Sequence, residues 1–242
     1  MSFTNIFKRY ELKYLITKEQ MQEILRRADA HIRCDEYGKS TICNIYYDTP
    51  DYLLIRRSLE SPLYKEKLRL RSYGVATENT PVFAEIKKKY DGVVYKRRIH
   101  TGEHAAMALC KGIAPTDRNQ ITNEILYFVR RYEGLRPAVF LSYEREAFYA
   151  KDDADFRITF DCDILWRDKD LTLSKGVYGN PILGDNEVLM EVKCAGAMPL
   201  WFVEILSDMH LFKTSFSKYG RAYCAMQQNK ETKQTQTVRR TA

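Results

Sequence analysis

The sequence predicts a mainly β protein of the α+β type, in which eight antiparallel strands close into a barrel and helices pack outside it. Segments with alternating apolar and polar residues recur along the chain, as amphipathic strands require. Short connections join most of them, and Asp91-Gly92 is typical of a two-residue hairpin. The helical patterns are separate rather than bundled, and eight strands are enough to close a barrel.

The predicted strands share a period of two in their apolar residues. In chain order they cover residues 10–16, 41–48, 64–73, 82–89, 93–100, 138–149, 156–165 and 188–194. Because most of the connections are short, the strands are predicted to be mainly antiparallel.

The clearest predicted helix covers residues 17–31. A Thr17-x-x-Gln20 capping box precedes apolar residues at Met21, Ile24 and Ala28, which share one helical face. Further helical patterns cover residues 103–111, 120–132 and 200–209, and a last one follows Ser217. We expect these helices to cover the apolar face of the sheet.

The chain has 242 residues, of which 45% are hydrophobic, so it can bury the core of one domain. We assign residues 1–226 to a single domain. Residues 227–242 are polar and lack apolar periodicity, so this tail is predicted to be disordered. The formal net charge of +7 favours an anionic partner.

The six cysteines are scattered without a Cys-x-x-Cys pair, which predicts reduced thiols with a structural role. Residues 1–9 lack the apolar segment of a signal peptide, and no stretch approaches the ~20 apolar residues that span a bilayer. We therefore expect a cytoplasmic protein without a membrane span.

The polar faces of six predicted strands carry mostly lysine and arginine. Period-two sets are Arg9, Glu11 and Lys13; Lys67, Arg69 and Arg71; Glu85, Lys87 and Lys89; Lys96 and Arg98; Arg157, Thr159, Asp161 and Asp163; and Glu191 and Lys193. Each set could be an ordinary solvated face of an amphipathic sheet. However, cations predominate in them, and without an anion these cations would repel one another.

A barrel that is apolar outside and cationic inside accounts for both faces of the strands. Its lumen would concentrate positive potential, and arginine offers forked donors that match phosphate oxygens. A carboxylate in that field would stay ionised and could hold a divalent metal that bridges phosphates, or could orient a neighbouring cation. The candidates are Glu191, Glu85 and Glu11.

Other phosphate chemistry has no signature in the sequence. There is no Gly-x-x-x-x-Gly-Lys loop, no Gly-x-Gly-x-x-Gly turn and no His-Glu-x-x-His, and the four histidines lack ligand spacing. A phosphate enzyme would therefore work with side chains on strands.

Several short pieces of the chain together resemble one known family, the VTC-type polyphosphate polymerase domain of the triphosphate tunnel metalloenzyme (CYTH-like) superfamily. These pieces are Arg9-Tyr-Glu-Leu-Lys-Tyr14, Tyr46-Tyr-Asp-Thr49, Lys67-Leu-Arg-Leu-Arg71 with Tyr73-Gly74, Glu85-Ile-Lys87, Ser142-Tyr-Glu-Arg145, Arg157-Ile-Thr-Phe-Asp161, Glu191-Val-Lys193 and Ser215-Phe-Ser-Lys-Tyr219. They occur in order between about residues 7 and 224, and the ordered set is far more specific than any one piece.

The resemblance implies an eight-stranded tunnel that transfers the γ-phosphate of ATP, or acts on another triphosphate, to extend inorganic polyphosphate with Mn²⁺ or Mg²⁺. It implies phosphate-gripping catalytic roles for Lys13, Arg69, Arg71, Lys87, Arg145, Arg157, Lys193 and Lys218. Lys67, Lys89, Lys96, Arg98, Lys213 and Ser217 are the predicted substrate contacts, and Glu191, Glu85 and Glu11 the predicted metal ligands.

Two departures from the family pattern bear on the reaction. Hydrolytic members are typified by Glu-x-Glu-x-Lys in the first strand, whereas Arg9 occupies the first of those positions here. A cation there disfavours a second metal with its activated water, and so favours transfer over hydrolysis. Ser215 stands where an active polymerase is expected to carry a basic residue.

Three alternatives therefore stay open: a tripolyphosphatase or nucleoside triphosphatase on the same fold, a non-catalytic polyphosphate-binding module, and a nucleic-acid binder. The last is disfavoured because the tyrosines form no recognisable stacking platform. A membrane-bound partner that receives the product is compatible with the sequence.

Overall fold

The computed structural model of the chain describes residues 10–91 and 93–241. Its strands are β1 (Tyr10–Thr17), β2 (Ile32–Asp48), β3 (Tyr64–Tyr73), β4 (Val82–Tyr90), β5 (Val93–Thr101), β6 (Arg136–Ala150), β7 (Arg157–Arg167), β8 (Asn180–Pro181) and β9 (Glu187–Cys194). Each of the eight predicted strands is present. The sequence did not indicate the two-residue β8, or the first part of β2, which begins at Ile32.

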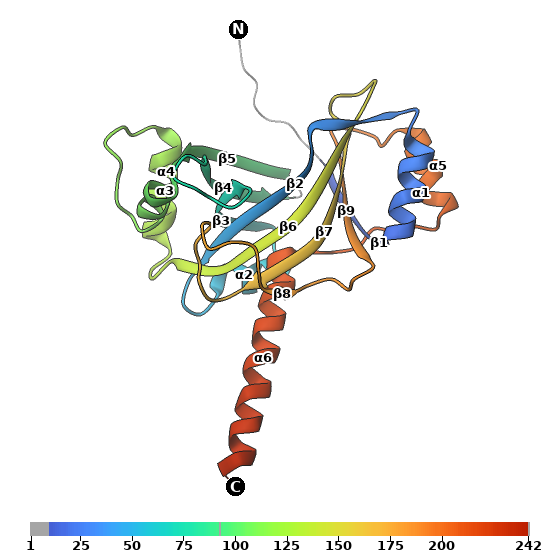
Figure 1. Cartoon of the computed structure of the whole chain (residues 1–242). Coiled ribbons are helices and arrows are strands. Elements are labelled where there is room, and N and C mark those ends of the chain that lie inside the picture. Colours follow the sequence, from blue (N-terminus) through green and yellow to red (C-terminus); the bar gives the residue numbers. More distant parts are fainter. Residues whose placement is uncertain (1–9, 92, 242) are drawn as a thin grey trace.

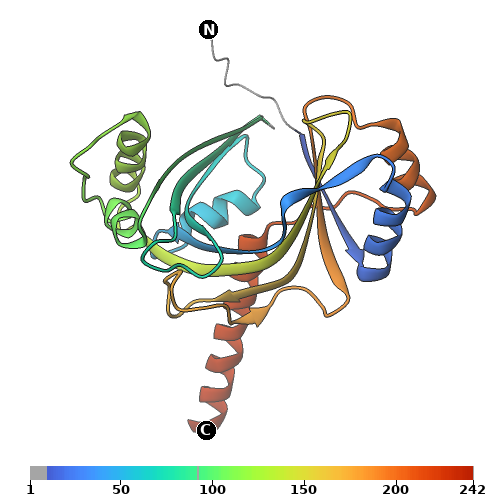
Figure 2. The ribbon, with the colours of Figure 1, turned by 45° about the horizontal axis from the view of Figure 1, so that its top comes forward.

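The strands form one antiparallel sheet in the order β1-β9-β7-β6-β2-β3-β4-β5, and β8 pairs with β7. The predicted closed barrel of eight strands is wrong, because the nine-stranded sheet is open: β1 and β5 stand at its two ends and are not paired with each other in the described part of the chain. Closure requires backbone hydrogen bonds between the end strands. Here the sheet curves strongly instead (Figure 2), and a side-chain ion pair from Glu11 on β1 reaches Lys87 on β4 at 3.3 Å.

The helices are α1 (Lys18–Ala28), α2 (Leu53–Leu59), α3 (Glu103–Cys110), α4 (Gln120–Arg131), α5 (Leu200–Asp208) and α6 (Lys218–Thr241). The five predicted helices are present, and α2 is the one the sequence did not indicate. Helix α1 begins as predicted, since Thr17 and Gln20 form a reciprocal capping box.

Two helix pairs cover the outer face of the sheet at opposite ends (Figure 1). Helices α1 and α5 bury Ile24 and Phe202 against β1, β7 and β9, in a cluster that includes Val192. Helices α3 and α4 bury Leu109 and Ile125 against β3 and β4. This apolar covering leaves the other face of the same strands to polar residues, as the period of two predicts.

Helix α6 begins on the inner face of the sheet and then extends away from the body of the molecule (Figure 1). Its first turns bury Tyr219, Ala222 and Met226 against inner-face residues such as Leu141 and Trp166. The structure has helix through Thr241, where the sequence predicts a disordered tail. Residues 227–241 contain neither glycine nor proline, so nothing in the local sequence interrupts a helix that is already anchored.

Asp48, in the Tyr46-Tyr-Asp-Thr49 piece, fixes where α6 begins. Its buried carboxylate accepts hydrogen bonds from the backbone N–H of Leu54 at 2.9 Å and Ile55 at 3.0 Å, and from the Tyr219 hydroxyl at 2.8 Å. One carboxylate thus caps the short helix α2 and holds the first turn of α6, which carries Lys218.

Candidate functional site

The inner face of the curved sheet gathers the charged residues of seven strands. The pairing register places Lys13 opposite Glu191 and Glu191 opposite Thr159 on β1, β9 and β7. At the other end, Arg69 lies opposite Glu85, which in turn lies opposite Arg98. Residues far apart in the sequence therefore share one concave, charged surface.

One group on this surface is built around Glu191 and Asp161, and we call it the carboxylate cluster. Its cations are Arg145, Lys193 and Lys218. Glu191 contacts Lys218 Nζ at 3.0 Å, Arg145 Nη2 at 3.4 Å and Lys193 Nζ at 3.4 Å. Asp161 accepts a forked pair of hydrogen bonds from Arg145 at 2.6 and 2.7 Å and contacts Lys218 at 2.5 Å.

The carboxylate cluster is buried yet ionised. Asp161 is fully buried and Glu191 is 6% exposed. Burial by itself would raise the pKa of each carboxyl, but Lys218 and the other cations lower the pKa of Glu191 well below its usual value and also lower that of Asp161. Both groups are therefore anions at neutral pH, and they hold their cations in fixed positions without a ligand.

A second buried carboxylate, Glu85, lies on β4. Arg69 contacts it at 2.7 Å, Lys96 at 2.7 Å and Arg98 at 3.9 Å. Burial opposes ionisation, but Arg69, Arg71 and Lys96 lower the pKa of Glu85 to about 2. Glu85 thus orients three predicted phosphate-binding side chains.

Four lysines on β3 and β4 form a contrasting group, which we call the lysine cluster: Lys65, Lys67, Lys87 and Lys89. They face one another in two cross-strand pairs, Lys65 with Lys89 and Lys67 with Lys87. Among the described residues, Lys87 has a carboxylate within 4 Å, namely Glu11, and the other three have none. Burial, together with Lys87, Lys13 and Lys65, lowers the pKa of Lys67 to about 8. This end of the surface has an excess of positive charge.

The start of α6 joins these groups. Ser217 Oγ lies 3.4 Å from Lys67 Nζ, and the Phe216 carbonyl accepts a hydrogen bond from Lys13 at 2.8 Å. Tyr143 contacts two further cations. Its hydroxyl accepts a hydrogen bond from Arg71 at 3.0 Å, and the centre of its ring lies 4.6 Å from Lys218 Nζ. The turn before α6 therefore positions cations from both ends of the sheet.

The predicted metal ligands do not gather at one point. No group of three or more His, Cys, Asp or Glu residues suited to a metal occurs in residues 10–91 and 93–241. Glu11 and Glu191, however, lie on either side of one ammonium, Lys13 Nζ, at 3.4 and 3.7 Å. These two carboxylates could contribute ligands to a divalent ion whose remaining ligands would be substrate oxygens, but in this arrangement Lys13 Nζ occupies the position between them. Glu85 lies on β4, where its two oxygens form ion pairs with Arg69 and Lys96.

A family model described as the VTC domain matches residues 8–227, which is nearly the whole described chain. The chain belongs to the VTC domain family. The resemblance inferred from its short motifs is thereby confirmed. No curated protein matches the chain.

Solved structures of similar shape support the same fold for this VTC domain. A candidate adenylate cyclase from Bacillus halodurans is 16% identical, with a TM-score of 0.53, over 87% of this chain and 95% of that one. A candidate adenylyl cyclase from Hippeastrum, described as having a dominant triphosphatase activity, is 14% identical, with a TM-score of 0.52, over 87% and 93%. At these identities the likeness concerns the fold. Among the described residues, no helix has both the length and the apolar character needed to cross a membrane.

The structure places most of the predicted site residues on the inner face of the VTC domain, but not all. Lys213 is exposed, in the segment before α6. Arg157 turns aside to Asp35, at 3.3 Å, and to the ring of Tyr149. Arg9, on which the preference for transfer depends, lies outside the described residues.

Sequence reasoning assigned no role in the site to three residues that hold it together: Asp161, Tyr46 and Asn44. Asp161 shares the period-two face of Arg157, and this signal could have identified it as a partner of Arg145. Asn44 and Tyr46 accept hydrogen bonds from Arg71 at 2.9 Å and Arg69 at 3.1 Å, respectively. Asp163, predicted to share that face, is exposed because its left-handed φ of 49° shifts the alternation of β7.

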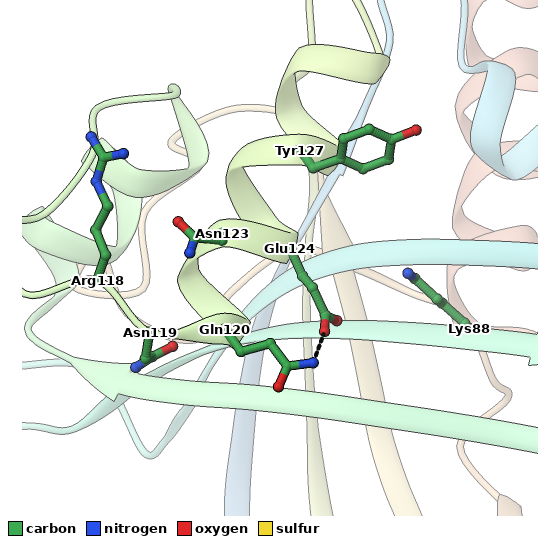
Figure 3. A pocket seen from close by; sticks show the side chains of 7 residues that line it. All are labelled: Lys88, Arg118, Asn119, Gln120, Asn123, Glu124 and Tyr127. Atoms are coloured by element: carbon green, nitrogen blue, oxygen red, sulfur yellow. Dashed lines mark hydrogen bonds between the residues drawn. The ribbon is translucent and has the colours of Figure 1, made fainter.

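A shallow hollow of about 600 Å³ lies away from this surface, between β4 and the start of α4 (Figure 3). Lys88 and Arg118 are its cations, and Glu124 and Tyr127 are among its other lining residues. Its charge is sparse and mixed, so it lacks the concentrated positive potential of the inner face.

The six cysteines of the VTC domain are free thiols. Burial raises the pKa of Cys43 to about 11 and that of Cys110 to about 12, so these two are unreactive at neutral pH. This agrees with the structural role that the sequence predicts for them.

Proposed function

We propose that this VTC domain is a polyphosphate polymerase, which transfers the γ-phosphate of ATP to the end of an inorganic polyphosphate chain on the concave face. The observation that carries the proposal is the unequal charge of that face. Buried carboxylates hold one set of cations in place, while the lysine cluster has cations in excess of the carboxylates near it. A polyanion of linked phosphates supplies the missing negative charge along a row of sites.

The proposed binding roles follow from which donors are held in place and aimed at the face. Arg69 and Arg71 are fixed by Glu85 and Asn44, and Arg145 and Lys218 by Asp161. Each still has donors left for phosphate oxygens. Lys13, Lys67, Lys87, Lys96 and Lys193 would add point charges along the path, with Lys89, Arg98 and Ser217 at its margins.

The reaction needs no protein nucleophile. A terminal phosphate oxygen of the chain forms a bond to the γ-phosphorus of ATP as the bond to the β-phosphate oxygen breaks, and ADP leaves. The fixed cations stabilise the charge on the transferred group and hold donor and acceptor in line. Glu191 and Glu11 would hold a Mn²⁺ or Mg²⁺ ion, which would neutralise further phosphate charge when bound.

A tripolyphosphatase is the second candidate, and two observations favour it. A protein of the same fold is described as a triphosphatase. Glu11 and Glu191 both remain ionised beside the lysines, with the pKa of Glu11 lowered to about 2 mainly by Lys87 against the opposing effect of burial. Hydrolysis would use the same phosphate contacts with water as the acceptor.

The test is to incubate the purified protein with γ-labelled ATP and Mn²⁺ and to separate the products by length. A ladder of chains that an exopolyphosphatase degrades supports the polymerase. Release of free phosphate alone, from ATP or tripolyphosphate, supports the hydrolase instead. Binding of polyphosphate without any turnover overturns both and leaves a non-catalytic binding module. A parallel reaction with EDTA shows whether turnover depends on metal.

A further inference from the structure

The outer end of the lysine cluster holds a pair of cations that a triphosphate does not require. Lys65 on β3 and Lys89 on β4 are directly paired, two residues beyond the Lys67–Lys87 pair in the direction of the Asp91 turn. Since strands advance about 3.3 Å per residue, this places the outer pair about 7 Å farther along the face. Because these lysines are two residues apart on each strand, all four side chains point to the same inner face of the sheet.

The outer pair is unfavourable unless an anion joins it. Like charges directly opposite each other on a sheet are destabilising. Within the described ranges, neither Lys65 nor Lys89 has a carboxylate within 4 Å. Burial, followed by the charges of Lys89, Lys13 and Lys87, lowers the pKa of Lys65.

A structural role accounts for only part of this arrangement. Lys65 Nζ donates a hydrogen bond to the Ser58 carbonyl in α2 at 3.2 Å, which uses one of its three donors. Lys89 has no polar partner in the part of the chain that the structure describes. It is half-buried beside three other lysines, so its position on this face is not explained by folding.

We propose that Lys65 and Lys89 form an outer phosphate subsite, which holds the part of a polyphosphate chain that lies beyond the three phosphates nearest Arg69 and Glu191. The proposal rests on the proposed function and adds the path of the chain, which runs along the β3–β4 strand pair toward its Asp91 end. A triphosphate is too short to use this subsite, whereas a longer chain covers it.

The test compares the binding of tripolyphosphate and of long-chain polyphosphate by titration calorimetry, at low and at moderate salt. The variants are the single Lys89→Gln and the double Lys65→Gln/Lys89→Gln. Lys88→Gln is the matched control, because Lys88 lies between them in sequence but faces α4 on the outside of the sheet (Figure 3). Thermal unfolding of each variant monitors the Ser58 contact.

The double variant is expected to bind long-chain polyphosphate about tenfold more weakly, with a shallower salt dependence, and tripolyphosphate less than about twofold more weakly. Lys88→Gln should match the wild type with both ligands. Equal weakening toward both ligands, or no weakening by Lys89→Gln alone, would overturn the outer subsite while leaving the proposed function in place. If the wild-type protein binds neither ligand, the proposed function and the subsite both fail.

Discussion

The carboxylate cluster and the lysine cluster face the same concavity but satisfy their charges in opposite ways. Around Glu191 and Asp161 the cations have internal partners at 2.5–3.4 Å, so that part of the site is assembled before any ligand arrives. Around Lys67 the neighbours are mainly other lysines. The first arrangement contributes to folding and positions donors, whereas the second lowers stability until an anion binds. A single substitution in the carboxylate cluster should therefore lower the stability of the ligand-free protein. One in the lysine cluster should lower the affinity for phosphate without lowering that stability.

The largest effect is expected from Glu191→Gln in the carboxylate cluster. Removing this carboxylate leaves the buried Lys218 and the half-buried Lys193 with less compensation, so the free energy of unfolding should fall by about 3–5 kcal/mol. Metal-dependent turnover should fall at least about 100-fold, because a predicted metal ligand and the anchor of several cations are lost together. Chemical denaturation and the labelled-ATP assay measure the two quantities.

Glu204→Gln is the matched control for that change, since it removes the same charge from an exposed position on α5. It should leave both stability and turnover near the wild-type values. Full metal-dependent turnover by Glu191→Gln would show that the metal is bound elsewhere. A loss of turnover without any loss of stability would contradict the view that this cluster is held together by its own ion pairs.

The opposite pattern is expected from Lys67→Gln in the lysine cluster. Affinity for tripolyphosphate should fall about tenfold through the loss of one charge-assisted contact. The stability of the ligand-free protein should stay the same or increase, because repulsion from Lys65 and Lys87 is relieved. Titration calorimetry and thermal unfolding without phosphate in the buffer test this. A clear loss of stability would mean that Lys67 has a structural role, and the contrast between the clusters would fail.

The residues of both clusters were predictable to different degrees. Alternation along each strand was enough to place Lys67, Arg69 and Arg71 on one polar face, because side-chain direction in a strand depends only on the local period. Which cation would meet which carboxylate depends on strand order and register, and neither is encoded locally. The pairing of Arg145 with Asp161, and the isolation of Lys89, became visible only with the sheet assembled.

The errors in the fold prediction have a similar origin. A local pattern of eight amphipathic strands does not reveal whether the first and last of the sheet will pair, and here the sheet stays open. Helix α2 has seven residues and receives its cap from Asp48 rather than from a local capping box, so its signal is tertiary. The first part of β2 contains Asp35, Glu36 and Gly38, which disfavour a strand, yet β2 pairs with β6 on both sides of that interruption.

The smallest expected effect is a pH dependence between pH 7 and 9, to which Lys67 and its neighbour Tyr46 contribute together with Lys96 and Lys193, whose pKa values burial lowers to about 8. The pKa of Lys67 is about 8, and that of Tyr46 is lowered to about 8 because Arg69, Lys67 and Arg71 outweigh its burial. As pH rises from 7 to 9, Lys67 loses its positive charge and Tyr46 gains a negative one. Affinity for tripolyphosphate should therefore decrease several-fold over this range, up to about the tenfold assigned to the Lys67 contact.

The free energy of unfolding of the ligand-free protein should increase over nearly the same pH range. Both groups have folded-state pKa values below the ordinary values of 10.5 for lysine and 10.0 for tyrosine, so between about pH 8 and pH 10 the unfolded chain binds more protons. Unfolding then becomes less favourable as pH rises. Calorimetric titrations at pH 7, 8 and 9, paired with thermal unfolding, should show that affinity falls and stability rises with pH in the wild type. Both changes should be smaller in Lys67→Gln. If Lys67→Gln keeps the wild-type pH profile of binding, the titration that weakens binding belongs to Lys96 or Lys193 and not to Lys67.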